Sequence, residues 1–194
     1  MNLALFFPAF FVPWGAHPMV GNYISRWRYL YFVFYRQKLG YGKVRSFLIA
    51  TLFGIISKRL YRGMDLIPTY EDMRLKTTFR KSEMMINNQK SILVFPEDSS
   101  QGYHDHILKY HEGFIAFADY YYQKYNMDLP IYPLYFSKKL NIILIDKPQS
   151  IRELYAKGLD RAGIAHFFKE CTNNLYQEIL DMKDSPSKKT QSVK

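Results

Sequence analysis

The chain has a single cysteine, Cys171, which falls in a predicted helix. One cysteine cannot form a disulfide within the chain, and it cannot supply a multi-cysteine metal site. This usage is compatible with a reducing cytosol. Because no neighbouring residue marks the thiol as activated, we interpret Cys171 as a small buried hydrophobe rather than a nucleophile.

Several common site motifs are also missing from the sequence. It has no Walker loop and no GxGxxG, so a nucleotide-binding fold has no motif in its support. The absence of GxSxG weakens any interpretation of Ser99 or Ser100 as a hydrolase nucleophile. The His-Asp-His triplet at residues 104–106 lacks an evident third ligand, so we expect no metal there.

The chain lacks an apolar run long enough to cross a membrane. Residues 1–14 are almost wholly apolar, but Pro8 and Pro13 interrupt them and no Lys or Arg precedes them. A signal peptide needs a basic start and a spanning helix needs about 20 apolar residues. We expect a short buried strand here, alone or together with part of a segment that anchors the chain at a membrane interface. We expect no helix before this strand.

Positive charge is concentrated in one part of the chain. The net charge is +10, and residues 26–81 hold 13 basic side chains against three acidic ones, which accounts for the whole excess. Such a region predicts an anionic partner, namely a phosphate-bearing substrate, an anionic lipid surface or a nucleic acid. A solvated basic face that only aids solubility is the plain alternative.

Two apolar stretches in this basic region keep more than one interpretation open. Residues 26–41 interleave aromatics with Arg and Lys, a pattern that can bind single-stranded nucleic acid, line a lipid or phosphate site, or form a buried element with basic ends. Residues 44–60 are too short and too closely flanked by charge to span a membrane. They predict either a core helix or a helix resting on a bilayer surface.

The remaining segments alternate between strand-like and helix-like patterns. We expect helices at 71–88, 112–124 and 151–181, the last interrupted near Gly158 and Gly163, and strands at 63–70, 91–95, 129–137 and 141–146. This alternation predicts an α/β fold with a mixed, mainly parallel sheet flanked by helices. We expect one domain over residues 1–183 and a disordered basic tail over 184–194.

Polar side chains follow two of the predicted strands directly. The buried strand at 91–95 leads through Pro96 into two carboxylates and two hydroxyls, Glu97, Asp98, Ser99 and Ser100. His17 follows the N-terminal strand in a loop rich in glycine and proline. Strand ends that open into polar loops are where α/β folds place their chemistry. The alternatives are an ordinary turn and a structural histidine.

Three segments in the second half of the chain resemble blocks of the glycerolipid acyltransferase superfamily, which includes the 1-acylglycerol-3-phosphate acyltransferases. Phe95-Pro96-Glu97 matches the start of that family's FPEG(T/S)R block. Residues 109–114, KYHEGF, resemble the basic-aromatic-glycine stretch FKxG, and Lys109 and Gly113 are its candidate substrate-binding residues. Residues 129–134, LPIYPL, resemble the VPIVPV strand, and the three segments stand in the family's order.

The first half of the chain resembles the family through position. His17 lies where the family's HxxxxD block is expected, and residues 63–70 lie where its second, substrate-contacting block is expected. The resemblance implies that His17 is a general base, which takes a proton from an acceptor hydroxyl that then attacks an acyl thioester. It further implies that Glu97 holds the acceptor's hydroxyls, with Asp98, Ser99 and Ser100 beside it.

The sequence departs from the family pattern at two places. Asn22 stands where the family has Asp, and an amide can orient an imidazole but cannot offset its positive charge. Either another carboxylate, Glu97 or Asp98, serves His17, or the chemistry is weak. Asp98-Ser99-Ser100 replaces Gly-Thr-Arg, so Arg59, Arg62 or Lys58 would have to supply the missing phosphate contact.

The resemblance implies an acyl donor, either acyl-CoA or acyl-carrier protein, and a glycerolipid or lysophospholipid-like acceptor. It implies an anionic membrane surface as a further partner, with the chain peripheral on the cytoplasmic face. No metal, no redox cofactor and no nucleic acid are expected. A catalytically impaired relative that only binds lipid or acyl carrier is the alternative.

Overall fold

The computed structural model describes residues 11–70 and 72–184, apart from the side chains of Arg62 and Asp184. The central sheet has three parallel strands in the order β2-β1-β3, formed by β1 (Phe11–Ala16), β2 (Ile67–Thr69) and β3 (Ser91–Leu93). Two helices follow β2 and β3, α4 (Leu75–Asn87) and α5 (Gly113–Tyr125). Parallel strands need such crossover helices, so this part confirms the expected α/β class.

The remaining strands form a separate hairpin in the described part of the chain. Strands β4 (Leu134–Ser137) and β5 (Ile142–Ile145) pair antiparallel with each other. The single mixed sheet predicted from the sequence is therefore wrong in this detail. The strand expected at 129–137 begins only after Pro133, which lacks the N–H that a strand needs, and Ile131 instead makes an isolated bridge to Gln149.

Strand β1 is buried at the centre of the sheet, whereas β3 is not. Val12 and Trp14 of β1 are buried, because β1 has a neighbour on each side. Strand β3 pairs with β1 alone among the described strands, and its apolar continuation ends at Phe95, which is 61% exposed. The prediction of a fully buried strand at 91–95 is wrong for this reason.

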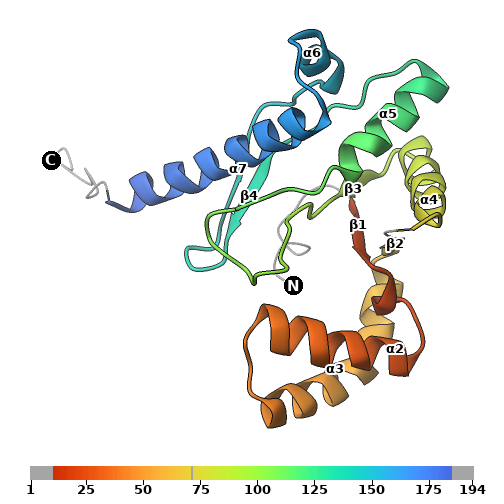
Figure 1. The fold of residues 1–194 in the computed structure, drawn as a ribbon, viewed down its shortest axis with the longest axis vertical. Helices are drawn as coiled ribbons and strands as arrows, with labels where there is room; N and C mark the ends of the chain where they lie inside the picture. The colour runs from red at the N-terminus through yellow and green to blue at the C-terminus, as the bar shows by residue number, and fades with distance from the viewer. Residues whose placement is uncertain (1–10, 71, 185–194) are drawn as a thin grey trace, which may run out of the picture.

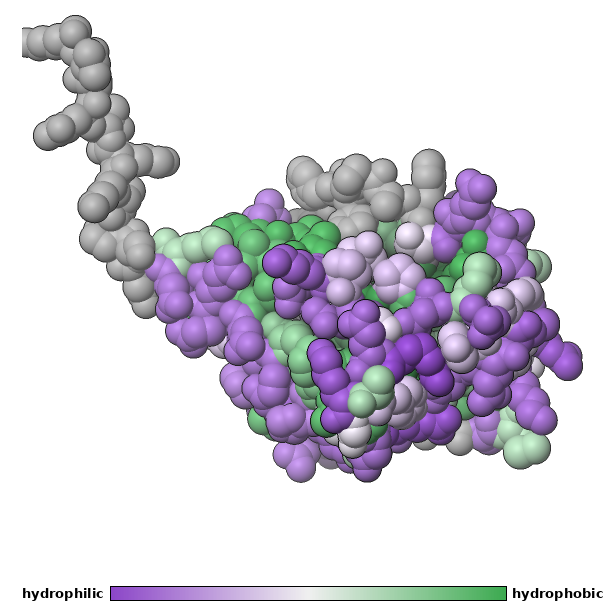
Figure 2. Space-filling view, turned by 90° about the horizontal axis from the view of Figure 1, so that it is seen from above, coloured by the Kyte–Doolittle hydropathy of each residue, from purple (hydrophilic) through white to green (hydrophobic). Residues whose placement is uncertain are grey.

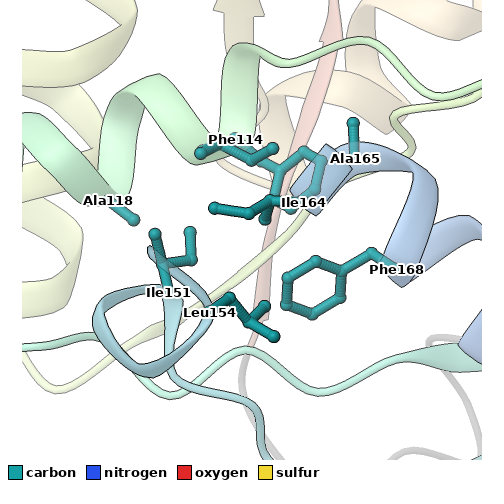
Figure 3. Packing of buried hydrophobic residues seen from close by; sticks show 8 residues of the cluster. Phe114, Ala118, Ile151, Leu154, Ile164, Ala165 and Phe168 are labelled. Atoms are coloured by element: carbon teal, nitrogen blue, oxygen red, sulfur yellow. The ribbon is translucent and has the colours of Figure 1, made fainter. Parts of the chain in front are cut away.

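Helices α5, α6 (Ile151–Ala156) and α7 (Arg161–Asp184) enclose the main hydrophobic cluster (Figure 3). Gly158, at φ +85°, breaks the helical segment between α6 and α7, as the sequence predicted, while Gly163 lies inside α7. The cluster is formed by apolar side chains on one face of each helix: Phe114, Ile115, Ala118, Ile151, Leu154, Ile164, Ala165 and Phe168. The sequence predicts a disordered basic tail over 184–194. Apart from the backbone of Asp184, which ends α7, these residues lie outside the described part of the chain.

The part of the chain that connects β1 to β2 forms a helical hairpin, which projects from the sheet (Figure 1). After the short 3-10 turn η1 (His17–Met19), the chain forms α2 (Tyr23–Arg28), which continues as the π-helix η2 (Tyr29–Lys38), and returns along α3 (Lys43–Gly63). The two arms meet through small side chains of α3 and through Arg26, which donates to the Gly54 carbonyl at 3.2 and 3.3 Å. No helix among the described residues is both long and apolar enough to cross a membrane.

Helices α4 and α5 are joined by a carboxylate that predicts how stability depends on pH. Glu83 is buried and accepts hydrogen bonds from Lys124, Tyr120 and Tyr125. The hydrogen bond from Lys124, followed by those from the two tyrosines, lowers the pKa of Glu83 to about 2 from its ordinary 4.5. A depressed carboxyl pKa stabilises the fold above the unfolded value, and this contribution disappears as the pH falls from about 4.5 towards 2.

We therefore expect Glu83→Gln to lower the free energy of unfolding at pH 7 and to flatten its decline between pH 4.5 and 2. Urea unfolding at several pH values measures both effects. Glu178→Gln, at an exposed position on α7, is the matched control and should leave the acid decline unchanged. An equally steep acid decline in Glu83→Gln would show that other carboxylates cause it.

Candidate active site

The sheet register places His17 and Glu97 at the same edge. Pro13 of β1 pairs with Leu93 of β3, and His17 and Glu97 each follow their paired residue by four positions. Because the two strands are parallel, both residues leave the sheet at its carboxyl end. Within residues 11–70 and 72–184, no hydrogen bond or ion pair joins them directly, and each has its own set of neighbours.

The His17 imidazole packs against a tyrosine that follows β2. Its ring centroid lies 4.6 Å from that of Tyr70, at an interplanar angle of 39°. The Arg74 guanidinium lies over the same tyrosine ring, with Cζ 4.6 Å from its centroid, and forms a salt bridge to Asp72 at 2.7 Å. The ring contact therefore holds the imidazole beside a charged pair.

Among the described residues, Asp72 interacts electrostatically with His17. Hydrogen bonds from the Arg74 side chain and backbone lower the pKa of Asp72 to about 2, and the nearby His17 acts in the same direction. The carboxylate is thus ionised at neutral pH. The sequence pointed instead to Glu97 or Asp98 as the carboxylate that serves His17.

Asn22 caps a helix. Its side-chain oxygen accepts a hydrogen bond from the Ser25 backbone N–H at 2.8 Å, and this closes the first turn of α2. Asn22 and Pro18, the residue after His17, also line a shallow groove of about 540 Å³. The groove continues along α2 and η2, where it is lined by Ile24, Ser25, Arg28, Tyr29, Phe32 and Val33.

Glu97 lies in a partly buried environment next to a lysine from the hairpin. Its backbone bridges to Tyr110, which fixes the loop after β3. Burial raises the pKa of Glu97, and the charge of Lys38 opposes that rise. Burial in turn lowers the pKa of Lys38, while Asp98 and Glu97 oppose the fall. The two side chains therefore stabilise each other's charged forms at this edge.

The hydroxyls beside Glu97 differ in their surroundings. Ser99 is buried and its Oγ accepts a hydrogen bond from Lys38 Nζ at 2.5 Å, so it anchors the loop to the end of η2. Ser100 is exposed, and its backbone N–H donates to Asp98 Oδ1 at 3.1 Å. Asp98 also lies 3.9 Å from His111 Nε2, across the loop. Ser100 thus remains the more accessible hydroxyl.

The other residues expected at the site lie at varying places around it. Lys109 is exposed, and its carbonyl accepts from the Asp98 N–H at 2.9 Å, which brings the two family-like segments together. Gly113 begins α5, where an added Cβ would lie 3.9 Å from the Trp14 ring. Arg59 is exposed on α3, and the side chain of Arg62 lies outside the described part.

Two features of the site were not predicted from the sequence. Lys38 and Tyr70 have no motif of their own, although the basic and aromatic character of 26–41 singled out the segment that carries Lys38.

The described residues include no group of three or more His, Cys, Asp or Glu side chains that could hold a metal ion. Burial raises the pKa of Cys171, which is only partly exposed, so its thiolate is disfavoured.

The arrangement provides a base and a carboxylate at one edge of a parallel sheet, and a different hollow lies near each of them. The shallow groove begins at Pro18, the residue after His17, whereas Glu97 lines a separate small hollow together with Asp98. An imidazole at a strand end can remove a proton from a hydroxyl. Comparisons of this chain with models of protein families, with curated proteins and with solved structures find no match.

Proposed function

We propose that the chain transfers an acyl group from an acyl thioester to a hydroxyl of a glycerolipid or lysophospholipid-like acceptor. The single observation that carries this proposal is the matched register of β1 and β3, which brings His17 and the Phe95-Pro96-Glu97 segment to the same sheet edge. The sequence resemblance requires these two segments to act together although 80 residues separate them. The donor is acyl-CoA or acyl-carrier protein.

In the proposed reaction His17 acts as the general base. Its imidazole takes the proton of the acceptor hydroxyl as the oxygen attacks the thioester carbonyl. The new C–O bond forms, the C–S bond breaks, and the thiolate leaves with the proton that His17 returns. Asp72 stabilises the transient imidazolium through space, and Glu97 accepts hydrogen bonds from the acceptor's other hydroxyls.

The groove that begins at Pro18, the residue after His17, supports a substrate with both apolar and anionic parts. Ile24, Phe32 and Val33 offer an apolar wall for an acyl chain, and Arg28 adds a cation at the same surface. A lipid substrate would place the chain on the cytoplasmic face of an anionic membrane, as a peripheral protein. The basic excess of residues 26–81 fits that location.

The role of Asn22 favours a second candidate, a protein that binds lipid or acyl carrier without catalysis. The oxygen of this amide is engaged by the backbone of α2, and an amide cannot offset the charge of an imidazolium. Among the described residues, the carboxylate that acts electrostatically on His17 is the exposed Asp72, itself paired with Arg74. If its field is too weak at His17, binding persists and transfer fails.

The two candidates are separated by incubating the purified chain with labelled acyl-CoA or acyl-carrier protein and a series of lysophospholipids. Formation of the diacyl product supports catalysis. Binding of donor or acceptor without product, at every acceptor tried, supports the second candidate. Failure of both binding and transfer removes both proposals.

Tyr70 is expected to position the His17 ring for this reaction. Tyr70→Ala removes the ring contact, and because small misplacements of a reacting group are costly, kcat should fall about 10-fold with little change in KM. Tyr70→Phe keeps the aromatic face and should retain most of kcat. A fall in Tyr70→Phe as large as in Tyr70→Ala would assign the effect to the phenol hydroxyl instead.

A further inference from the structure

Helix α3 buries small residues and exposes large apolar ones, which is the reverse of the usual arrangement in water. The side that faces α2 and η2 buries small residues, namely Ser46, Ala50, Gly54 and Ser57. Six large apolar side chains of the same helix are each more than half exposed: Val44, Phe47, Leu48, Leu52, Ile55 and Ile56. In water the hydrophobic effect favours the opposite arrangement, with the large side chains inside. The helix is therefore built for an apolar neighbour on its outer side.

Small residues at a helix–helix contact and large apolar residues on the outside are typical of helices in lipid. Because α3 is not long and apolar enough to cross a bilayer, the remaining lipid geometry is a helix lying along the surface. Its charges fit that geometry, since Lys43 and Arg45 precede the uncharged stretch and Lys58 and Arg59 follow it. Such side chains extend towards phosphate groups while their stems stay in contact with apolar surface.

The charge of the whole region favours an anionic bilayer over a protein partner. Residues 1–64 contain nine Lys and Arg and no Asp or Glu. A second copy of the hairpin would therefore bring two basic surfaces together, which costs energy, whereas anionic headgroups attract them. Figure 2, which views the molecule from the end opposite the hairpin, shows a mainly hydrophilic surface.

The apolar surface of α3 continues towards the candidate active site. Phe47 of α3 makes an edge-on contact with Trp27, with ring centroids 5.7 Å apart, and Trp27 in turn contacts Phe32 at 6.5 Å. Phe32 lines the groove that begins at Pro18, next to His17. Trp27 also donates to Thr51 at 3.0 Å, which ties the two arms together at this point. Tryptophan is enriched where proteins meet the headgroup layer.

We propose that the outer face of α3, continued by Trp27 and Phe32, lies on an anionic bilayer, so that the groove opens towards the lipid. This inference rests on the proposed function for the direction in which substrate enters, because a lipid acceptor would then reach His17 without leaving the membrane. The docking surface itself is independent of any reaction.

Flotation of the full chain with phosphatidylglycerol–phosphatidylcholine vesicles, without an acyl donor, tests the surface. The wild type should bind, and Leu48→Gln combined with Leu52→Gln should weaken binding at least about 10-fold, because two leucine side chains that would enter the bilayer are lost. Both positions face outwards, so circular dichroism should show an intact fold. Met84→Gln combined with Met182→Gln removes exposed apolar side chains from α4 and α7, and should bind as the wild type does.

A second pair of variants tests the charge. Lys43→Gln combined with Lys58→Gln should reduce the preference for anionic over neutral vesicles and reduce the sensitivity to salt. The proposal is overturned if the wild type does not bind, or if Leu48→Gln/Leu52→Gln binds equally well. It is also overturned if the wild type forms a dimer that this variant dissolves and neither binds vesicles.

The assay separates this proposal from the proposed function. Binding to vesicles without acyl transfer to any acceptor would leave the docking surface standing and remove the enzyme. Acyl transfer to an acceptor dissolved in detergent, together with absent vesicle binding, would leave the enzyme standing and remove the docking surface. His17→Ala should bind vesicles as the wild type does, because His17 lies outside the α3 face.

Discussion

Replacing His17 with alanine should lower kcat for acyl transfer by about 10² to 10⁴-fold, the range that general-base catalysis contributes. The imidazole is the titratable group at the carboxyl end of β1, and its ring is held against Tyr70. Alanine leaves the acceptor hydroxyl without a group to take its proton during the attack. Initial rates with a saturating acyl donor and a lysophospholipid acceptor measure the effect.

His166→Ala is the matched control for this experiment. His166 is an exposed histidine on α7, paired with Glu170 at 3.5 Å, and it lies on a different element from the sheet edge. Its loss should leave kcat within about 2-fold of the wild type, as expected for a surface substitution. If His17→Ala retains wild-type kcat while its fold is intact, His17 is not the base, and the proposed mechanism fails.

The parallel sheet was predictable because its strands carry local signals. Ser91–Leu93 is a short apolar run that ends near a proline, and Ile67–Thr69 follows a turn after a long helix. The hairpin at 134–145 was harder, because a strand pattern does not state which sheet the strand joins. That choice depends on contacts with α7, which are distant in the sequence.

The π-helix η2 and the reversed apolar pattern of α3 show where hydrophobic periodicity alone does not predict the structure. Residues 44–60 are apolar on all sides, so the pattern alone left both a core helix and a bilayer-surface helix open. The structure shows a helix with one side in a hydrophobic cluster and the other in the open, since Ala50 and Gly54 are buried and Leu52 and Ile55 are exposed. The spacing of small residues was the signal that could have shown this, because small residues permit close helix contact.

The candidate site was predictable only at its two strand ends. His17 and Glu97 each follow a recognisable apolar strand, and the register brings both to one edge. Tyr70, Asp72 and Lys38 reach that edge from segments without a motif, so their roles depend on tertiary contacts. Asn22 shows the opposite case, because its position suggested an imidazole partner while its local geometry makes it a helix cap.

The second large effect is expected at Glu97, through binding of the acceptor. A carboxylate that accepts hydrogen bonds from acceptor hydroxyls contributes about 1.5–3 kcal/mol, which corresponds to about 10- to 150-fold in affinity. Glu97→Gln should therefore lower kcat/KM for the acceptor by that factor, mainly through KM. Glu112→Gln replaces a nearby exposed glutamate and should change kcat/KM little.

The pH profile identifies the charge of Glu97 as the cause. Burial raises the pKa of this carboxyl and the Lys38 ammonium opposes the rise, so Lys38→Met should raise the pKa further. The acidic limb of acceptor binding, measured in a His17→Ala background so that the imidazole does not contribute, should then move to higher pH, because Glu97 becomes protonated sooner as the pH falls. Ser99→Ala removes the hydrogen bond to Lys38 but keeps its charge, and should leave the limb in place. A limb that moves equally in both variants would mean that loop geometry, and not the ammonium charge, controls this edge of the sheet.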